Sequence, residues 1–250
     1  MAYTIADFDD LRAKLLGRGG LWHMLRKDLL QQLEMPAHFD QATCPELGCA
    51  PNLSVVMIAM GGLETMATMA KIGGCVPSDN ATETVKRFSD RYFTQVAPLY
   101  ARPADQSLIR LLWDAYRNGG IHRFFPKAGK VEIGGRPVNV TFGISWLEVS
   151  GPGAKRSATL DQARAARASV PAVTVEPVGQ ESFNVWLCAQ LFVLDFIDAV
   201  EKWMGELTVA APLGPWFVTG AGEVKDGLAP KAHPESLACL TDLLTSASSA

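Results

Sequence analysis

The chain has 250 residues, of which 48% are hydrophobic and 20% charged, and its formal net charge is -3. Such a chain is long and apolar enough to bury a core of its own. Because positive charge is not in excess, non-specific attraction to nucleic acid is excluded, and any RNA or nucleotide binding has to be local. The five cysteines are odd in number and scattered, which argues against a disulfide framework.

The start of the chain lacks the pattern of a secretion signal. Asp7, Asp9 and Asp10 occupy the region where a signal peptide has a positive flank followed by an apolar run, so a cytoplasmic protein is expected. The most apolar segment, 54–70, contains Glu64 near its middle. A buried helix explains this segment better than a membrane span does, and no membrane association is expected.

The first half of the chain has the periodicity of helices. Apolar residues recur at three- and four-residue spacing, and clusters of glycine or proline separate the runs. The pattern predicts helices over 6–16, 20–34, 52–72, 81–96 and 105–118. The 52–72 segment is apolar on nearly all sides, which is typical of the central helix of a bundle.

After residue 118 the hydrophobic period changes from about 3.6 residues to 2. Segments 130–133 and 137–149, joined by Gly134-Gly135, indicate a β-hairpin or a small meander. Further along, the sequence predicts a loop, a short helix and an extended piece, at 151–154, 158–168 and 170–178.

A last strong helix is expected from residue 180 or 181 to about Met204. Three acidic residues fall near one of its faces, namely Asp195, Asp198 and Glu201. Because no His or Cys accompanies them, the prediction is a solvated face, on which Asp198 pairs with Lys202 four residues later.

These elements predict a mainly α protein, a helical bundle with a small β-hairpin or meander inserted after the helix over 105–118. Residues 1–204 are expected to form one helical domain with the β insertion at about 130–150. Residues 205–250 are expected to be a C-terminal extension whose last residues are disordered.

The segment Ser107–Lys127 contains the one motif that points to chemistry, Arg117-Asn118-Gly119-Gly120-Ile121-His122. A histidine titrates near neutral pH and can move a proton between two oxygens. An arginine binds phosphate oxygens with two parallel donors. Together they would suffice for metal-independent cleavage of RNA, in which a 2'-hydroxyl attacks its own phosphate.

This motif resembles the signature of the HEPN domains, a nucleotide-binding group of higher eukaryotes and prokaryotes. The signature is an Arg, a polar residue that is often Asn, and a His four to six positions after the Arg, and it fits Arg117, Asn118 and His122. The resemblance extends to the apolar helix before the motif and the aromatic residues after it. One HEPN toxin branch has a tyrosine two positions after the histidine, where this chain has Phe124.

The resemblance implies a helical-bundle ribonuclease or nucleotide-binding module, typically a homodimer in which two motifs meet at one cleft. Arg117 and His122 would be catalytic, and Asn118 would orient them. Arg123 and Lys127 are candidates for binding the substrate. The β-hairpin after the motif is associated more with bacterial relatives than with the toxins, and no cofactor is implied.

A rival interpretation is a non-catalytic module that dimerises or docks a protein partner. Arg117 and His122 would then be ordinary cationic residues at a helix end, where they interact with the last carbonyls. The enzyme interpretation requires both side chains to face an open, shared cleft, and burial in salt bridges would contradict it.

Glu64 is the other residue singled out, because an unpaired carboxylate on an apolar helix is costly. We expect it to support Arg117 or Arg110, or else to face a gap in the bundle and reach water. No metal site is expected. His38, Cys44 and Cys49 are the one cluster that hints at a metal, and they provide too few ligands for a zinc site.

Overall fold

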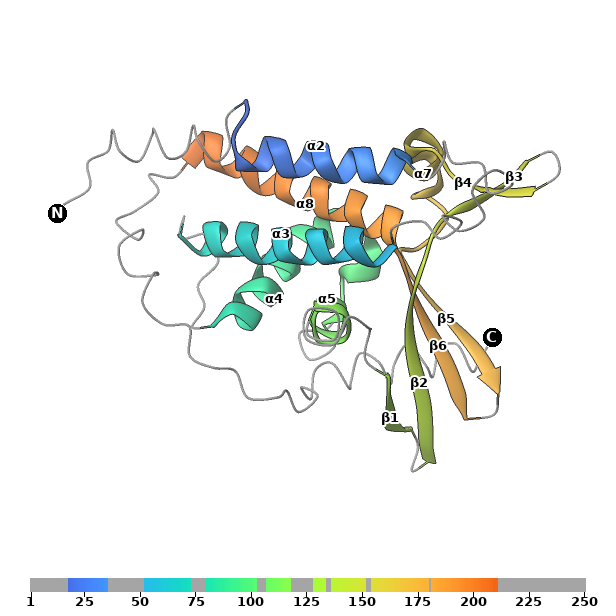
Figure 1. Cartoon of the computed structure of the whole chain (residues 1–250). Coiled ribbons are helices and arrows are strands. Elements are labelled where there is room, and N and C mark those ends of the chain that lie inside the picture. The colour runs from blue at the N-terminus through green and yellow to red at the C-terminus, as the bar shows by residue number, and fades with distance from the viewer. Residues whose placement is uncertain are drawn as a thin grey trace.

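The computed structural model describes residues 18–35, 52–72, 80–102, 107–117, 128–133, 136–151, 154–179 and 181–210. The expected helix over 6–16 and most of the expected C-terminal extension lie outside these residues. Within them the protein has a layer of helices with a mixed β-sheet at one end (Figure 1).

Three long helices lie side by side and form the body of the helical layer (Figure 1). They are α2 (Leu21–Glu34), α3 (Asn52–Ile72) and α8 (Ala189–Ala210). The approach is close at Gly62, where an added Cβ would lie 2.7 Å from Leu25 of α2 and 3.2 Å from Phe196 of α8. A glycine at this point lets the three helices pack together.

The central position expected for α3 is observed. Its segment Leu53–Ala70 is long and apolar enough to cross a membrane by length and composition, with a mean hydropathy of 1.5, yet half of it is buried within the protein. It packs against α2, α8, α4 (Ala81–Tyr92) and the end of the helix expected over 105–118, which we call the motif helix because the motif begins at its last residue. Burial against these neighbours accounts for a helix that is apolar nearly all round.

The motif helix and the short elements before it complete the helical layer. The helix expected over 81–96 is α4 followed by the 3-10 turn η3 (Phe93–Gln95), and a second 3-10 turn, η4 (Pro98–Tyr100), comes next. The helix expected over 105–118 is α5 (Leu108–Leu112), which continues as a π-helix, η6 (Trp113–Arg117).

The expectation of a mainly α bundle with a β insertion is wrong. The sheet has four strands in the order β1-β2-β6-β5. Their bounds are β1 (Ala128–Ile133), β2 (Arg136–Ser145), β5 (Val173–Gly179) and β6 (Ser182–Cys188). The hairpin β1–β2 is present, but β2 also pairs in parallel with β6, and β6 pairs antiparallel with β5. The fold is therefore an α/β mixture.

The start of the predicted helix over 180–204 is the specific error. Residues 182–188 form β6, in which Phe183, Val185 and Leu187 are buried and alternate with partly exposed residues. This two-residue period is typical of a strand, and pairing on both sides satisfies its backbone polar groups. α8 begins directly after it and continues to Ala210, past the boundary expected at residue 204.

Two smaller elements connect β2 to β5. The two ends of the expected loop at 151–154 belong to a separate two-stranded sheet of β3 (Glu148–Gly151) and β4 (Ala154–Ser157), and the two residues between them lie outside the described residues. The expected short helix is α7 (Leu160–Ala166), which begins with a capping box formed by Thr159 and Gln162. The extended piece expected over 170–178 contains β5.

Gly143 provides a test of the unexpected pairing of β2 with β6. It lies opposite Trp186, and a Cβ at position 143 would lie 2.2 Å from the indole ring. We expect Gly143→Ala to lower the free energy of unfolding by about 1–3 kcal/mol, because the ring or the strand must move. Urea denaturation measures this change.

Gly129→Ala is the matched control, because Gly129 lies in β1 of the same sheet with no atom within 4 Å of an added Cβ. It should change stability by less than about 1 kcal/mol. Equal stability of the two variants would show that Trp186 does not cover Gly143.

Candidate functional site

The motif helix has an unusual backbone at the position where the motif begins. Ser107 caps α5 by accepting a hydrogen bond from the backbone N–H of Arg110 at 3.3 Å. After Leu112 the helix widens into η6, and π-helical turns of this kind are frequent at functional sites. Arg117 is its last residue. Asn118, His122, Arg123 and Lys127 lie outside the described residues.

Tyr116 attaches the end of η6 to the sheet. Its side chain is fully buried, and its hydroxyl donates a hydrogen bond to the Gly143 carbonyl oxygen at 2.6 Å. Burial raises the pKa of Tyr116 far above its usual value, so the hydroxyl stays a neutral donor. The residue before the motif arginine is therefore held against β2.

Arg117 is held from the other side, by α3. Its Nη2 donates to Glu64 Oε2 at 3.0 Å, and its guanidinium carbon lies 5.2 Å from the centre of the Trp113 ring. The Arg117 side chain is 25% exposed and that of Glu64 is 30% exposed. Of the alternatives for Glu64, contact with Arg117 is the one observed.

The other arginine considered for Glu64 has its own carboxylate. Arg110 is buried, and its Nε lies 3.8 Å from Asp114 Oδ2, one helical turn further along. The two arginines of the motif helix therefore have separate acidic partners.

Two properties of the Arg117 pair bear on function, and they point in opposite directions. A guanidinium has five N–H donors in a planar fork, so a carboxylate that engages one side orients the whole group toward a ligand. The same carboxylate offsets much of the positive charge that would attract a phosphate. The role of Arg117 as a catalytic residue stays a prediction.

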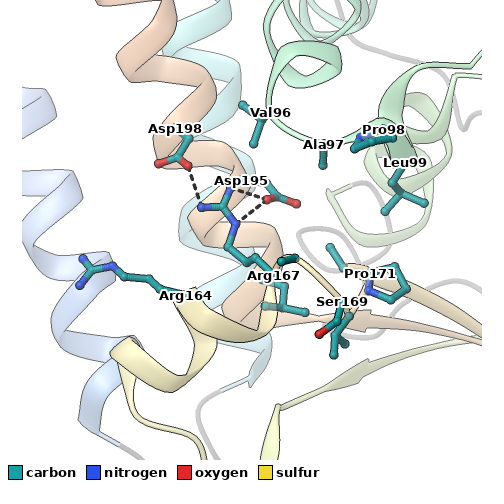
Figure 2. Close-up of a pocket in the computed structure, with 14 residues that line it drawn as sticks. Val96, Ala97, Pro98, Leu99, Arg164, Arg167, Ser169, Pro171, Asp195 and Asp198 are labelled. Atoms are coloured by element: carbon teal, nitrogen blue, oxygen red, sulfur yellow. Dashed lines mark hydrogen bonds and ion pairs between the residues drawn. The ribbon is translucent and has the colours of Figure 1, made fainter.

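A second polar cluster lies elsewhere on the protein, where α8 meets the turn after α7. Arg167 donates two hydrogen bonds to Asp195 Oδ1, from Nη2 at 2.7 Å and from Nε at 3.1 Å. It donates a third to Asp198 Oδ2 at 2.6 Å. The hydroxyl of Tyr100 donates to Asp195 Oδ2 at 2.8 Å. Figure 2 shows the guanidinium of Arg167 between the two carboxylates.

Burial governs the protonation of this cluster. Asp195 is 4% exposed, and burial raises the pKa of its carboxyl group, while Arg167 and Tyr100 act against the rise. Burial likewise raises the pKa of Tyr100 well above its usual value, and the charge of Asp195 adds to that rise. Burial alone would lower the pKa of Arg167, but its hydrogen bond to Asp198 and the two negative charges outweigh this effect and raise it.

The cluster borders a cavity of about 530 Å³. Its apolar walls come from the connection between α4 and α5, from the turn after α7, and from α8. They include Val96, Pro98, Leu99, Val170, Pro171 and Leu191. Of the motif residues, Arg117 is the one that the structure describes, and it does not line this cavity, which is therefore distinct from the Arg117 site.

The prediction of a solvated acidic face on α8 is wrong for Asp195. Asp195 is buried, Asp198 pairs with Arg167 instead of Lys202, and Glu201 pairs with Arg26 of α2 at 2.7 Å. The sequence contains a signal for this burial. Leu194-Asp195-Phe196-Ile197 places a carboxylate within an apolar run, and such an acid requires a buried partner.

No family model, curated protein or solved structure matches this chain. The resemblance to HEPN domains therefore depends on the motif and the helix that carries it. Within the described parts of the chain, no group of three or more His, Cys, Asp and Glu side chains is placed to hold a metal ion. His38, Cys44 and Cys49 lie outside those parts.

The Glu64–Arg117 pair can be measured with a double-mutant cycle of Glu64→Gln, Arg117→Gln and the double variant. The pair is partly exposed, so we expect a coupling energy of about 0.5–1 kcal/mol that decreases as salt is raised. Thermal or urea unfolding gives the four stabilities. The exposed Arg87–Glu83 pair on α4 is the control, expected at about 0.3–0.5 kcal/mol. A coupling near zero would contradict a structural role for the Arg117 pair.

Tyr100→Phe tests the buried cluster. It removes the hydroxyl that donates to Asp195, and we expect it to cost about 1–3 kcal/mol because a buried carboxylate oxygen loses its partner. Tyr92→Phe is the control, since the Tyr92 hydroxyl donates to Glu206, whose side chain is 38% exposed and reaches water. If both variants cost the same, the Asp195 cluster does not depend on Tyr100.

The pH dependence of the same variant has a defined sign. The pKa of the Asp195 carboxyl group is higher in the folded protein than in the unfolded chain, so its protonation at low pH stabilises the folded state. This contribution to the free energy of unfolding is lost as pH rises through the folded-state pKa. The Tyr100 hydrogen bond lowers the pKa of Asp195, so its removal should move that loss to higher pH. Unfolding measured from acid to neutral pH gives the shift.

Proposed function

We propose that the end of the motif helix binds RNA or a nucleotide through a phosphate and that the protein is a metal-independent endoribonuclease. The observation that carries this proposal is the fixed orientation of Arg117 by Glu64 and Trp113, with a quarter of the Arg117 side chain exposed. An arginine already held in place loses little side-chain entropy when it binds a phosphate.

His122 supplies the proton transfer. It accepts the proton of a ribose 2'-hydroxyl, whose oxygen attacks the neighbouring phosphorus, and the bond to the 5'-oxygen breaks. A protonated group, such as His122 of a second copy across a homodimer cleft, gives a proton to the departing 5'-oxygen. Arg117 stabilises the charge that develops on the phosphate. The products are a 2',3'-cyclic phosphate and a 5'-hydroxyl.

Asn118 orients the two catalytic side chains in this proposal, and Arg123 and Lys127 bind the RNA backbone. With Arg117 they concentrate positive charge in a short segment of an otherwise acidic chain. This local charge is what phosphate binding requires, because Glu64 offsets that of Arg117. A cytoplasmic location, where RNA is present, belongs to the same proposal.

A non-catalytic interaction module is the second candidate, and a specific observation favours it. Arg117 is already in an ion pair, partly buried, and ties the motif helix to α3. In this case the motif residues maintain the fold or a dimer, and a protein partner replaces RNA. The two candidates differ in whether Arg117 has to be accessible to a ligand.

Cleavage of a mixed RNA pool in EDTA tests the enzyme proposal. His122→Ala and Arg117→Ala should each lower the rate by about 100-fold or more, because each removes a group that acts in the transition state. Arg87→Ala removes an exposed arginine on α4 and should cleave like wild type. Product ends, identified by mass spectrometry, should be cyclic phosphates.

The other outcomes decide against the proposal. Activity that survives in His122→Ala would come from a contaminant. Inactivity of wild type, together with no saturable binding of single-stranded RNA or nucleotides by fluorescence anisotropy, would favour the interaction module. Light scattering on the same samples measures whether the protein is a dimer.

A further inference from the structure

The cavity beside Arg167 has the form of a small-molecule site. Its volume of about 530 Å³ lies in the usual range for ligand pockets, and its wall combines apolar side chains with a few convergent polar groups. Figure 2 shows the Val96–Leu99 segment on one side of it and Ser169 and Pro171 on another, with the Arg167 cluster between α7 and α8. The residues come from three separate parts of the chain.

The charges at the cavity determine which ligand fits. Arg167 is matched against two carboxylates, so the cluster has one negative charge in excess when both are ionised. Arg164 also lines the cavity, but its guanidinium pairs with Asp161 at 3.0 Å and is directed away from Asp195 in Figure 2. The excess negative charge favours a cation over an anion.

The hydrogen-bonding capacity agrees with this sign. A carboxylate has about four acceptor positions. Asp198 uses one, for Arg167, and its other oxygen accepts no hydrogen bond from the described residues. Its side chain is 43% exposed, so a ligand can reach it without unfolding the cluster.

We propose that this cavity binds a small organic ammonium ion. Its N–H groups donate to Oδ1 of Asp198 and to the edge of the Asp195 carboxylate, and its hydrocarbon part lies against the apolar side chains of the wall. Arg167 holds both carboxylates in place and does not itself bind the ligand. The site shares no residue with the motif helix, so it stands whether or not the protein cleaves RNA.

Three probes that share a phenethyl group separate charge from apolar contact at pH 7: phenethylammonium, neutral 2-phenylethanol and anionic 3-phenylpropanoate. Titration calorimetry on the full chain should give a Kd on the order of 0.1–1 mM for the ammonium ion, in line with its size. The alcohol should bind about tenfold more weakly or worse, and the carboxylate should not bind, because each lacks the charged donor.

Two variants locate the site. Asp198→Asn should weaken ammonium binding about tenfold or more, whereas Glu201→Gln, which removes another partly exposed carboxylate of α8 whose partner is Arg26 of α2, should leave it unchanged. Ala97→Phe fills the cavity from an extended backbone position that accepts any side chain, and it should abolish binding of both the ammonium ion and the alcohol. Melting curves check that each variant is folded.

Several results would overturn the proposal. These are no saturable binding of the ammonium ion up to about 10 mM, equal binding of all three probes, preferential binding of the carboxylate, or an affinity unchanged by Asp198→Asn. The motif variants Arg117→Ala and His122→Ala should bind the ammonium ion like wild type, and Asp198→Asn should not change RNA cleavage. Failure of one proposal is therefore distinguishable from failure of the other.

Discussion

The continuity of β6 with α8 is the constraint on which the rest of the fold depends. The strand ends at Cys188 and the helix begins at Ala189, so no linker allows the sheet and the helical layer to move independently. β6 lies between β2 and β5, and the helix it leads into packs on α3. The Cys188 N–H donates to the Ala172 carbonyl oxygen at 2.8 Å and fixes the junction to the segment before β5.

Both charged sites follow from this junction. β2 is placed by its pairing with β6, and Tyr116 hydrogen-bonds to β2, so the start of the motif is set by the sheet. Asp195 lies about two helical turns into α8 from the same junction, where it meets Arg167. One strand-to-helix connection thus positions the end of the motif helix on one side and the cavity on another.

The sequence predicted the helices well and the sheet poorly, for a physical reason. The apolar pattern of 52–72 is long, and length distinguishes a helix from a strand. The segment 182–188 is short and leads directly into an equally apolar helix. Its alternation of buried and partly exposed residues is therefore hidden when 180–204 is treated as one helix. Parallel pairing with β2 involves segments about 40 residues apart, and local pattern contains no information on such a partner.

The sites divide in the same way. Glu64 is a lone acid on an apolar helix, so the sequence predicts a cationic partner for it, and that partner is Arg117. The same rule applied to Asp195 predicts burial, but three acids at helical spacing suggested an exposed face instead. The partners of Asp195 come from η4 and from the turn after α7, far away in sequence. A buried acid can be predicted from its neighbours in the chain, whereas its partner cannot.

The two arginines illustrate how one kind of ion pair serves different ends. Arg167 pairs with two carboxylates, Asp195 and Asp198, so the local charge is negative and the arginine serves to hold the carboxylates in place. Arg117 pairs with Glu64, and two further cationic residues follow it in the sequence, Arg123 and Lys127. A net charge near zero over the chain thus conceals two regions of opposite local sign, and local sign determines which ligands approach each region.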